Sequence, residues 1–228
     1  MIYGSGLVAR AMAPNFPSDR IIAYAAGVSN SRCADGSEFL RERERLQRAL
    51  DLHQHSERFL YFSTCSVEDQ SARESLYVRH KVAMESLVRE HPRHLNLRLP
   101  QVAGHTPNPH TLLNFLHARI ARSEKFEIWE RSTRNILDID DIATLVGHLV
   151  LQEGAVAETI NVANITSIPV TEIVAEMEKL VGKPAVVETR ASGSSYSIDC
   201  ARITPAIRQS GVNLQGNYLE RVLKKYYG

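Results

Sequence analysis

Apolar runs alternate with amphipathic stretches along the first hundred residues of the chain. The apolar runs cover residues 1–3, 20–27, 59–64 and 94–100, and glycine, proline or hydroxyl residues end most of them. The stretches between them, such as residues 77–91, carry charged and apolar residues with the period of a helix. Several apolar runs do not alternate with polar residues. They therefore predict an α/β fold with a parallel sheet covered by helices on both faces.

Residues 38–56 show the helical pattern most clearly. Phe39, Leu46, Leu50 and Leu52 fall roughly on one stripe among many charged residues, which predicts a helix with one buried face. Residues 101–111 contain one glycine and two prolines, and we expect a loop there.

The pattern changes after residue 111. Helical stretches are expected at 112–125, 170–182 and 217–228, short strands at 126–130, 159–164 and 184–190, and a strand running into a helix at 134–152. We predict a Rossmann-like cofactor-binding core in residues 1–110. Residues 111–228 would complete that core and form a small substrate lobe.

Composition restricts the function classes. The net charge of +1 among 228 residues gives no electrostatic support to binding of nucleic acid or a membrane surface. Three widely spaced cysteines suit a reducing compartment better than a disulfide framework. The first residues lack the basic and apolar regions of a signal peptide, and no apolar run approaches a membrane span. We expect a cytoplasmic protein.

A glycine-rich turn follows the first apolar run. Residues 4–9, GSGLVA, fit the pattern G-x-G-x-x-A between a predicted strand and a predicted helix. Glycines there allow the backbone to approach a pyrophosphate, and the amide groups at the start of the helix face its charge. A tight turn without a ligand has the same pattern. The acidic residue that normally follows the second strand and binds a ribose is missing, because that run ends in Gly27, Val28 and Ser29.

A hydroxyl, a phenol and an ammonium follow the third apolar run. Tyr77 and Lys81 are four residues apart and share one face of a helix. A free phenol has a pKa of about 10, and a nearby ammonium lowers that pKa so that the phenolate can accept a proton from a sugar hydroxyl. Thr64, at the end of the strand, could hydrogen-bond the same oxygen. The alternative is a half-buried tyrosine beside a solvated lysine.

Taken in order, the segments YGSGLVA, IIAYAAG, FLYFSTCSV, YVRHKVAME, LRLPQVAGH, RNILDIDDIA and TINVAN resemble the extended short-chain dehydrogenase/reductases, in particular the NAD-dependent epimerase/dehydratase family. The resemblance implies a soluble enzyme that uses NAD or NADP on a nucleotide-linked sugar. It implies Thr64 as the catalytic hydroxyl, with Ser63 and Ser66 as fallback positions, Tyr77 as the base and Lys81 as its support.

The resemblance also implies binding residues. Those near the cofactor would be Gly4, Ser5, Gly6, Leu7, Ala25, Ala26, Gly27, Ser63, Tyr77, Lys81, Leu99, Pro100 and Gln101. Ser66, Asn114 and Arg134 would face the substrate, with Arg134 a candidate for the diphosphate. No metal site is expected, because the paired histidines lack companions in a fixed pattern. Cys65 would be a small buried residue.

The chain departs from the family in its length. Residues 20–27 resemble the family's fourth strand, so the second and third strands, which carry most of the adenosine pocket, would be absent. Alternatively these residues are the second strand, with Arg32 near a 2′-phosphate. In the first case the first strand becomes a sheet edge. We then expect a homodimer or a covering segment, and weak NAD(P) binding.

Two functions follow from the sequence. The first is an epimerase or keto-reductase of a nucleotide-linked sugar, serving bacterial surface polysaccharide. Dehydration is disfavoured, because Cys65 and Ser66 stand where sugar 4,6-dehydratases carry an acidic pair. The second is a Rossmann-like binding or partner protein that lost catalysis and binds dinucleotide weakly or not at all.

Overall fold

A five-stranded parallel sheet forms the centre of the protein. The computed structural model describes residues 1–15, 20–151, 156–193 and 195–228. The sheet order is β1-β2-β3-β4-β9, and every neighbouring pair is parallel. The strands are β1 (Ile2–Tyr3), β2 (Ile21–Tyr24), β3 (Arg58–Thr64), β4 (His94–Leu99) and β9 (Glu158–Asn161). The predicted α/β class is confirmed.

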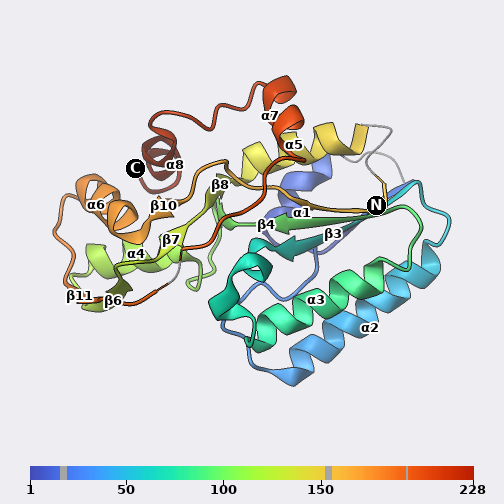
Figure 1. The fold of residues 1–228 in the computed structure, drawn as a ribbon, viewed down its shortest axis with the longest axis horizontal. Coiled ribbons are helices and arrows are strands. Elements are labelled where there is room, and N and C mark those ends of the chain that lie inside the picture. Colours follow the sequence, from blue (N-terminus) through green and yellow to red (C-terminus); the bar gives the residue numbers. More distant parts are fainter. Residues whose placement is uncertain (16–19, 152–155, 194) are drawn as a thin grey trace.

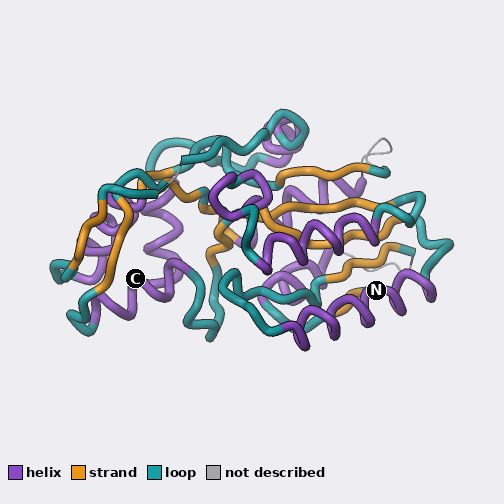
Figure 2. The backbone as a smooth tube through the Cα atoms, turned by 60° about the horizontal axis from the view of Figure 1, so that its bottom comes forward, coloured by secondary structure: helices purple, strands orange, loops and turns teal. Residues whose placement is uncertain are grey.

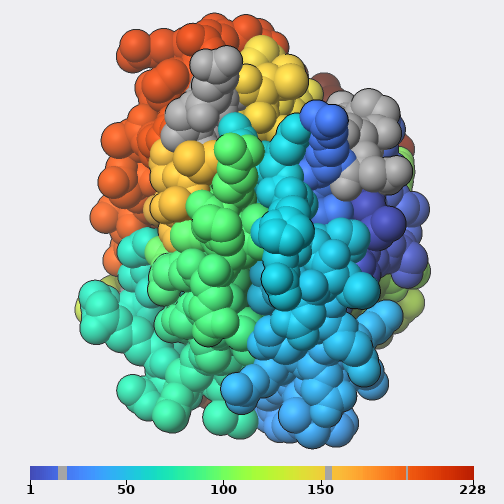
Figure 3. All heavy atoms as spheres, turned by 90° about the vertical axis from the view of Figure 1, so that its right-hand side faces the viewer, coloured from blue at the N-terminus to red at the C-terminus, as the bar shows by residue number. Residues whose placement is uncertain are grey.

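Helices cover both faces of this sheet (Figure 1). On one face lie α2 (Gly36–Leu52) and α3 (Leu76–Val88), which Figure 3 shows side by side on the surface as blue and green columns. On the other face lie α1 (Leu7–Met12), α5 (Ile139–Leu151) and α7 (Thr204–Ser210). Short 3₁₀ turns span Ala13–Asn15, Cys65–Glu68 and Gln70–Ala72.

The strands divide their side chains between two hydrophobic clusters. Phe59 and Tyr61 of β3 pack under α2 and α3, whereas Leu60 and Phe62 pack into the larger core on the opposite face. This division follows from the alternation of side chains along a strand. Because both faces are buried, a strand such as β3 can be apolar at nearly every position.

A smaller lobe adjoins the carboxyl ends of the strands (Figure 2). It contains α4 (Leu112–Ala121), α6 (Val170–Val181) and α8 (Tyr218–Tyr227). Three two-stranded sheets complete the fold: β5 (Gln101–Ala103) with β8 (Ile136–Asp138), β6 (Phe126–Trp129) with β11 (Val187–Arg190), and β7 (Thr133–Arg134) with β10 (Ile168–Pro169). The expectation of a loop throughout 101–111 is wrong at its start, because residues 101–103 pair with β8.

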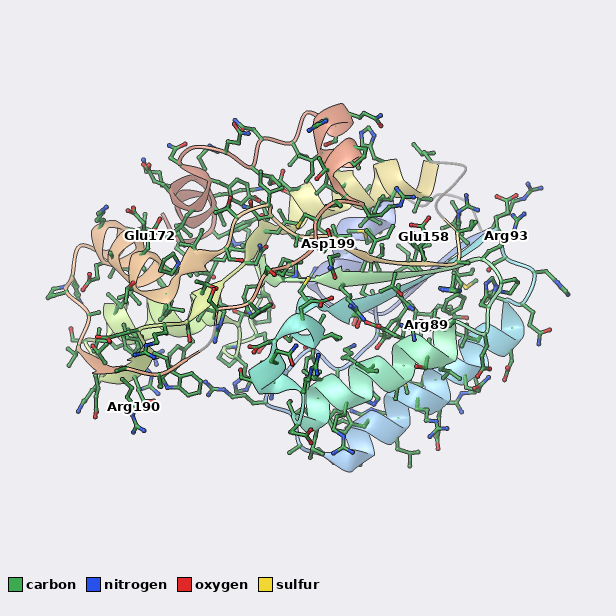
Figure 4. The ribbon with its side chains drawn as sticks, viewed as in Figure 1. Arg89, Arg93, Glu158, Glu172, Arg190 and Asp199 are labelled. Atoms are coloured by element: carbon green, nitrogen blue, oxygen red, sulfur yellow. The ribbon has the colours of Figure 1, made fainter. Side chains whose placement is uncertain are left out.

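The two edges of the main sheet differ. At the β9 edge, Arg202 binds the carboxylate of Glu158 through Nε at 2.6 Å and Nη2 at 3.1 Å, and Asn161 donates to the carbonyl of Asp199 at 3.1 Å. Glu158 and Asp199 are labelled in Figure 4. At the other edge, no strand within the described residues pairs with the outer side of β1. The expectation that β1 becomes a sheet edge is confirmed.

The buried stripe of α2 differs from the expected one. Leu46 and Leu50 are buried as expected, but Leu52, the last residue of α2, is 75% exposed. Glu42, one turn before Leu46, is only 3% exposed. A carboxylate therefore occupies a core position of this helix.

Candidate active site

The carboxyl ends of the parallel strands meet at one edge of the sheet, which is where open α/β folds bind ligands. Gly4 follows β1 with a φ of +118°, a conformation that favours glycine. A Cβ on Gly4 would lie 2.5 Å from the carbonyl oxygen of Ala25, at the end of β2. Gly6 begins α1 with a φ of −73°, and no heavy atom lies within 4 Å of the Cβ it lacks. Packing therefore requires Gly4 but not Gly6.

Thr64 and Tyr77 meet at the end of β3. The hydroxyl of Thr64 lies near enough to the phenol to lower the pKa of Tyr77 by hydrogen bonding, and both residues are buried. The hydroxyl of Thr64 also accepts the backbone amide of Ser66 at 3.1 Å, which closes the turn after the strand. Of the two fallback hydroxyls, that of Ser63 points to the opposite face and donates to Glu85 at 2.6 Å.

The phenol of Tyr77 is protonated at neutral pH in this state. Burial raises the pKa of Tyr77, hydrogen bonding with Thr64 lowers it and the negative charge of Glu42 raises it, and together these effects give a pKa of about 12. A base at this position therefore needs additional positive charge near the phenol oxygen to work at neutral pH.

Lys81 is buried one helical turn after Tyr77, with 3% of its surface exposed. Its ammonium donates to the hydroxyl of Tyr61 at 3.0 Å, to Oε1 of Glu42 at 3.3 Å and to the carbonyl of Phe62 at 3.4 Å. An ammonium has three hydrogens, so these contacts occupy all of its donors. Burial lowers the pKa of Lys81, and the charge of Glu42 counteracts that effect.

A cleft of about 650 Å³ opens in front of Tyr77, between the core and the small lobe. Of the predicted residues, Ser66, Tyr77, Gln101 and Arg134 line it. Leu99 is buried at the end of β4, and Pro100 separates β4 from β5. Asn114 is not among the lining residues found in the described part of the chain. Its amide is bound to the carbonyls of Thr106 and Asn108 and to the hydroxyl of Tyr227.

Residues that the sequence did not single out also line the cleft. Trp129, 47% exposed, is in the lobe. Tyr196 reaches the cleft from the segment before α7 and hydrogen-bonds the side chain of Ser66. No motif marks these positions, because the lobe places them through contacts between segments distant in sequence.

Two other candidate features have structural explanations. Cys65 is fully buried, and burial raises the pKa of its thiol, so it is a poor nucleophile. The histidines form no metal-binding group with cysteine or carboxylate side chains, as far as the described residues show. Likewise, no helix in the described residues is long and apolar enough to cross a membrane.

The chemistry of the strand ends fits a dinucleotide. The turn at Gly4 and Gly6, the small residues Ala25 and Ala26 and the Thr64–Tyr77 pair all lie at the same carboxyl edge, so backbone amides and hydroxyls face one region. Lys81 is the exception, because all three of its hydrogen-bond donors are already occupied and none is available to a dinucleotide.

Residues 5–163 match the family model described as the NAD dependent epimerase/dehydratase family. The match covers more than half of the 228 residues. The chain belongs to this NAD-dependent family, as the sequence motifs indicated. No curated protein sequence matches it.

Solved structures of proteins complexed with NAD or NADPH share the fold. The UDP-glucuronic acid 4-epimerase of Bacillus cereus, solved with UDP-glucuronic acid and NAD, superposes with a TM-score of 0.73 at 19% identity, over 93% of this chain and 78% of that one. RMD of Pseudomonas aeruginosa, complexed with NADPH, gives 0.68 at 17% identity, over 97% and 86%. The dTDP-glucose 4,6-dehydratase of Bacillus anthracis, complexed with NAD, gives 0.68 at 16% identity, over 90% and 71%.

Proposed function

We propose that the protein is an NAD(P)-dependent epimerase or keto-reductase acting on a nucleotide-linked sugar. The observation that carries the proposal is the hydroxyl of Thr64 next to the buried phenol of Tyr77, beside the cleft between the core and the lobe. Family membership supports the cofactor. Thr64, Tyr77 and Lys81 are the proposed catalytic set.

The residues of this pair handle the proton of the reaction. Tyr77 would accept the proton of a sugar hydroxyl when a ketone forms and return it when the ketone is reduced. Thr64 fixes the direction of the phenol oxygen. When bound, the nicotinamide supplies hydride transfer to and from the sugar carbon. Gly4, Ser5, Gly6, Leu7 and the strand end Ala25–Gly27 are the proposed cofactor residues, together with Ser63 and Leu99–Gln101.

The cleft suits an anionic substrate with a polar sugar. Arg32, Arg119, Lys125 and Arg134 all line it, against the two carboxylates of Asp69 and Glu127. A guanidinium binds two phosphate oxygens at once, which makes Arg134 the proposed diphosphate contact. Ser66, beside Thr64, is another proposed substrate residue, as is Asn114, whose amide a substrate would have to release from its present partners. Residues 65 and 66 carry no carboxylate, so we propose epimerisation or reduction instead of dehydration.

The Tyr77→Phe substitution tests this function. Removal of the phenol hydroxyl should lower kcat/KM by about 10²–10⁴-fold, the usual contribution of a general acid–base group. The assay is turnover of a panel of UDP-, GDP- and dTDP-sugars with NAD(H) and NADP(H). Tyr226→Phe is the matched control, because that hydroxyl binds Asp138 and Tyr226 does not line the cleft. Activity that survives Tyr77→Phe would refute the mechanism.

The second candidate is a Rossmann-like binding or partner protein without turnover. The occupied donors of Lys81 favour it, as does the sheet that ends at β1. Calorimetric titration with NADH and NADPH distinguishes the candidates, together with the turnover assay. A chain that binds nucleotide-sugar but neither dinucleotide is a binding protein.

We further propose a cytoplasmic homodimer that acts in the synthesis of bacterial surface polysaccharide. The outer edge of β1, which none of the described strands pairs, supports an assembly in which another copy or a covering segment protects it. Light scattering coupled to size exclusion measures the mass. A monomer at micromolar concentration would contradict the dimer.

A further inference from the structure

A buried carboxylate that the proposed reaction does not use lies behind Tyr77. Glu42 projects from α2 toward β2, β3 and α3, and its side chain is 1% exposed. Its two oxygens have four partners: the hydroxyl of Tyr61 at 2.7 Å, the amide of Val28 at 2.7 Å, Nε2 of His80 at 3.0 Å and Nζ of Lys81 at 3.3 Å. Such complete coordination holds the carboxylate in one place.

The partners of Glu42 fix where Lys81 points. The ammonium lies 5.0 Å from the centre of the Tyr61 ring, and its three donors are used by Glu42, Tyr61 and the carbonyl of Phe62. In the described part of the chain Lys81 lines neither the cleft before Tyr77 nor the small cavity of about 200 Å³ at the end of β2. A ribose hydroxyl could engage Lys81 only by displacing one of these contacts.

The ion pair also lies directly against the end of β2. A Cβ on Gly27 would be 2.6 Å from Nζ of Lys81 and 2.7 Å from Oε1 of Glu42. Glu42 lines the small cavity at this strand end, together with Ala26, Gly27 and Val28. The pair therefore occupies the place where the strand end and the catalytic helix come together, and not a remote part of the core.

We propose that Glu42 is a positioning residue that withholds Lys81 from the dinucleotide, so that ligand and carboxylate compete for the same ammonium. This inference rests on the proposed function and deepens it. It identifies the Glu42–Lys81 contact, in addition to the shortened sheet, as a cause of weak cofactor binding. In the wild-type protein a dinucleotide then gains the contact with Lys81, a member of the proposed catalytic set, only at the expense of the contact between Lys81 and Glu42.

The Glu42→Gln substitution tests the competition. Glutamine keeps the shape and an acceptor for Tyr61 but removes the charge that holds Lys81. The affinity for NADH, measured by calorimetry, should rise by about tenfold or more, the value of one charge-assisted hydrogen bond. Glu44→Gln is the matched control. It makes the same change on α2 at an exposed position that lines neither cavity in the described part of the chain, and it should leave the affinity unchanged.

The double variant Glu42→Gln/Lys81→Met provides a second measurement, and it decides the question if the single variant does not fold. Since Lys81 is withheld in the wild type, removal of both charges should leave the NADH affinity within about twofold of the wild-type value. A loss of about tenfold or more, or a single variant that binds no tighter than wild type, would overturn the inference. Absence of binding by every variant would instead overturn the proposed function. Wild-type binding with no gain in Glu42→Gln would overturn only the inference.

Discussion

Arg98 of β4 holds Glu85 of α3 through two parallel hydrogen bonds, Nε to Oε1 and Nη2 to Oε2, both 2.8 Å long. Glu85 is fully buried and also accepts the hydroxyl of Ser63. The third nitrogen of the guanidinium, Nη1, binds Glu68 at 2.7 Å in the turn after Thr64. One arginine thus connects β4, the helix of Tyr77 and the turn that follows Thr64.

Arg98→Leu should destabilise the protein by about 3–5 kcal/mol, because it removes the charged partner that binds both oxygens of a buried carboxylate and leaves it with the longer contact from Arg89 at 3.4 Å. Arg98→Lys should recover only part of this, since an ammonium cannot form the two parallel bonds. Urea unfolding followed by circular dichroism gives the free energy of unfolding. Arg20→Met, which removes a surface pair with side chains 75% and 46% exposed, should cost below about 1 kcal/mol. Equal losses in Arg98→Leu and Arg20→Met would contradict this assignment.

The sequence was sufficient for the sheet and for the hydroxyl–phenol pair, because local signals specify both. Four apolar runs marked the first four strands of the main sheet, and the short run at 159–164 marked β9. The order of a strand that ends at Thr64 and a helix that carries Tyr77 predicted that these two residues would lie close together. The sheet edge at β1 could also be predicted, since residues 20–27 are followed by one helix and then by the strand of Thr64.

The contacts of the Lys81 ammonium could not be predicted from the sequence. A helical Tyr-x-x-x-Lys spacing shows that two side chains share a face, but not where the ammonium points. Glu42 lies in the run RERER, which looks like a solvated helix surface. The available signal was its position one turn before Leu46, on the stripe that Leu46 and Leu50 define. Asn114 was predicted at the substrate, but α8, far away in sequence, contributes the Tyr227 hydroxyl that binds its amide.

Gly4, the first glycine of the turn after β1, should not tolerate substitution. Gly4→Ala forces a φ that non-glycine residues rarely adopt and a clash with Ala25, so it should cost at least about 1–3 kcal/mol. Gly36→Ala is the control: this glycine begins α2 with open space at its Cβ, so alanine there should gain up to about 1 kcal/mol. Thermal unfolding should therefore show melting temperatures that shift in opposite directions.

Gly6→Thr separates the ligand role of the turn from its structural role. Threonine suits the first position of a helix about as well as glycine, and the site has room for it, so stability should stay within about 0.5 kcal/mol of wild type. If the pyrophosphate approaches the backbone there, the affinity for NADH in calorimetry should fall by about tenfold or more. An unchanged affinity would place the dinucleotide away from this turn.

The pH dependence of stability should reveal the charge of Glu42. Burial raises its pKa, but the bonds from His80, Val28 and Tyr61 and the charge of Lys81 outweigh burial and lower the pKa from 4.5 to about 2. Because the pKa of Glu42 is lowered in the folded protein, the stability that its ionised form contributes is fully present above about pH 4.5. That stability is lost as the pH falls toward 2. By pH 3 the wild type should lose roughly 2 kcal/mol through this group. Urea unfolding at pH 7, 5, 4 and 3 should show that excess loss in wild type and in Glu44→Gln, but not in Glu42→Gln/Lys81→Met. Parallel curves for all three proteins would show that Glu42 is not held ionised by these partners.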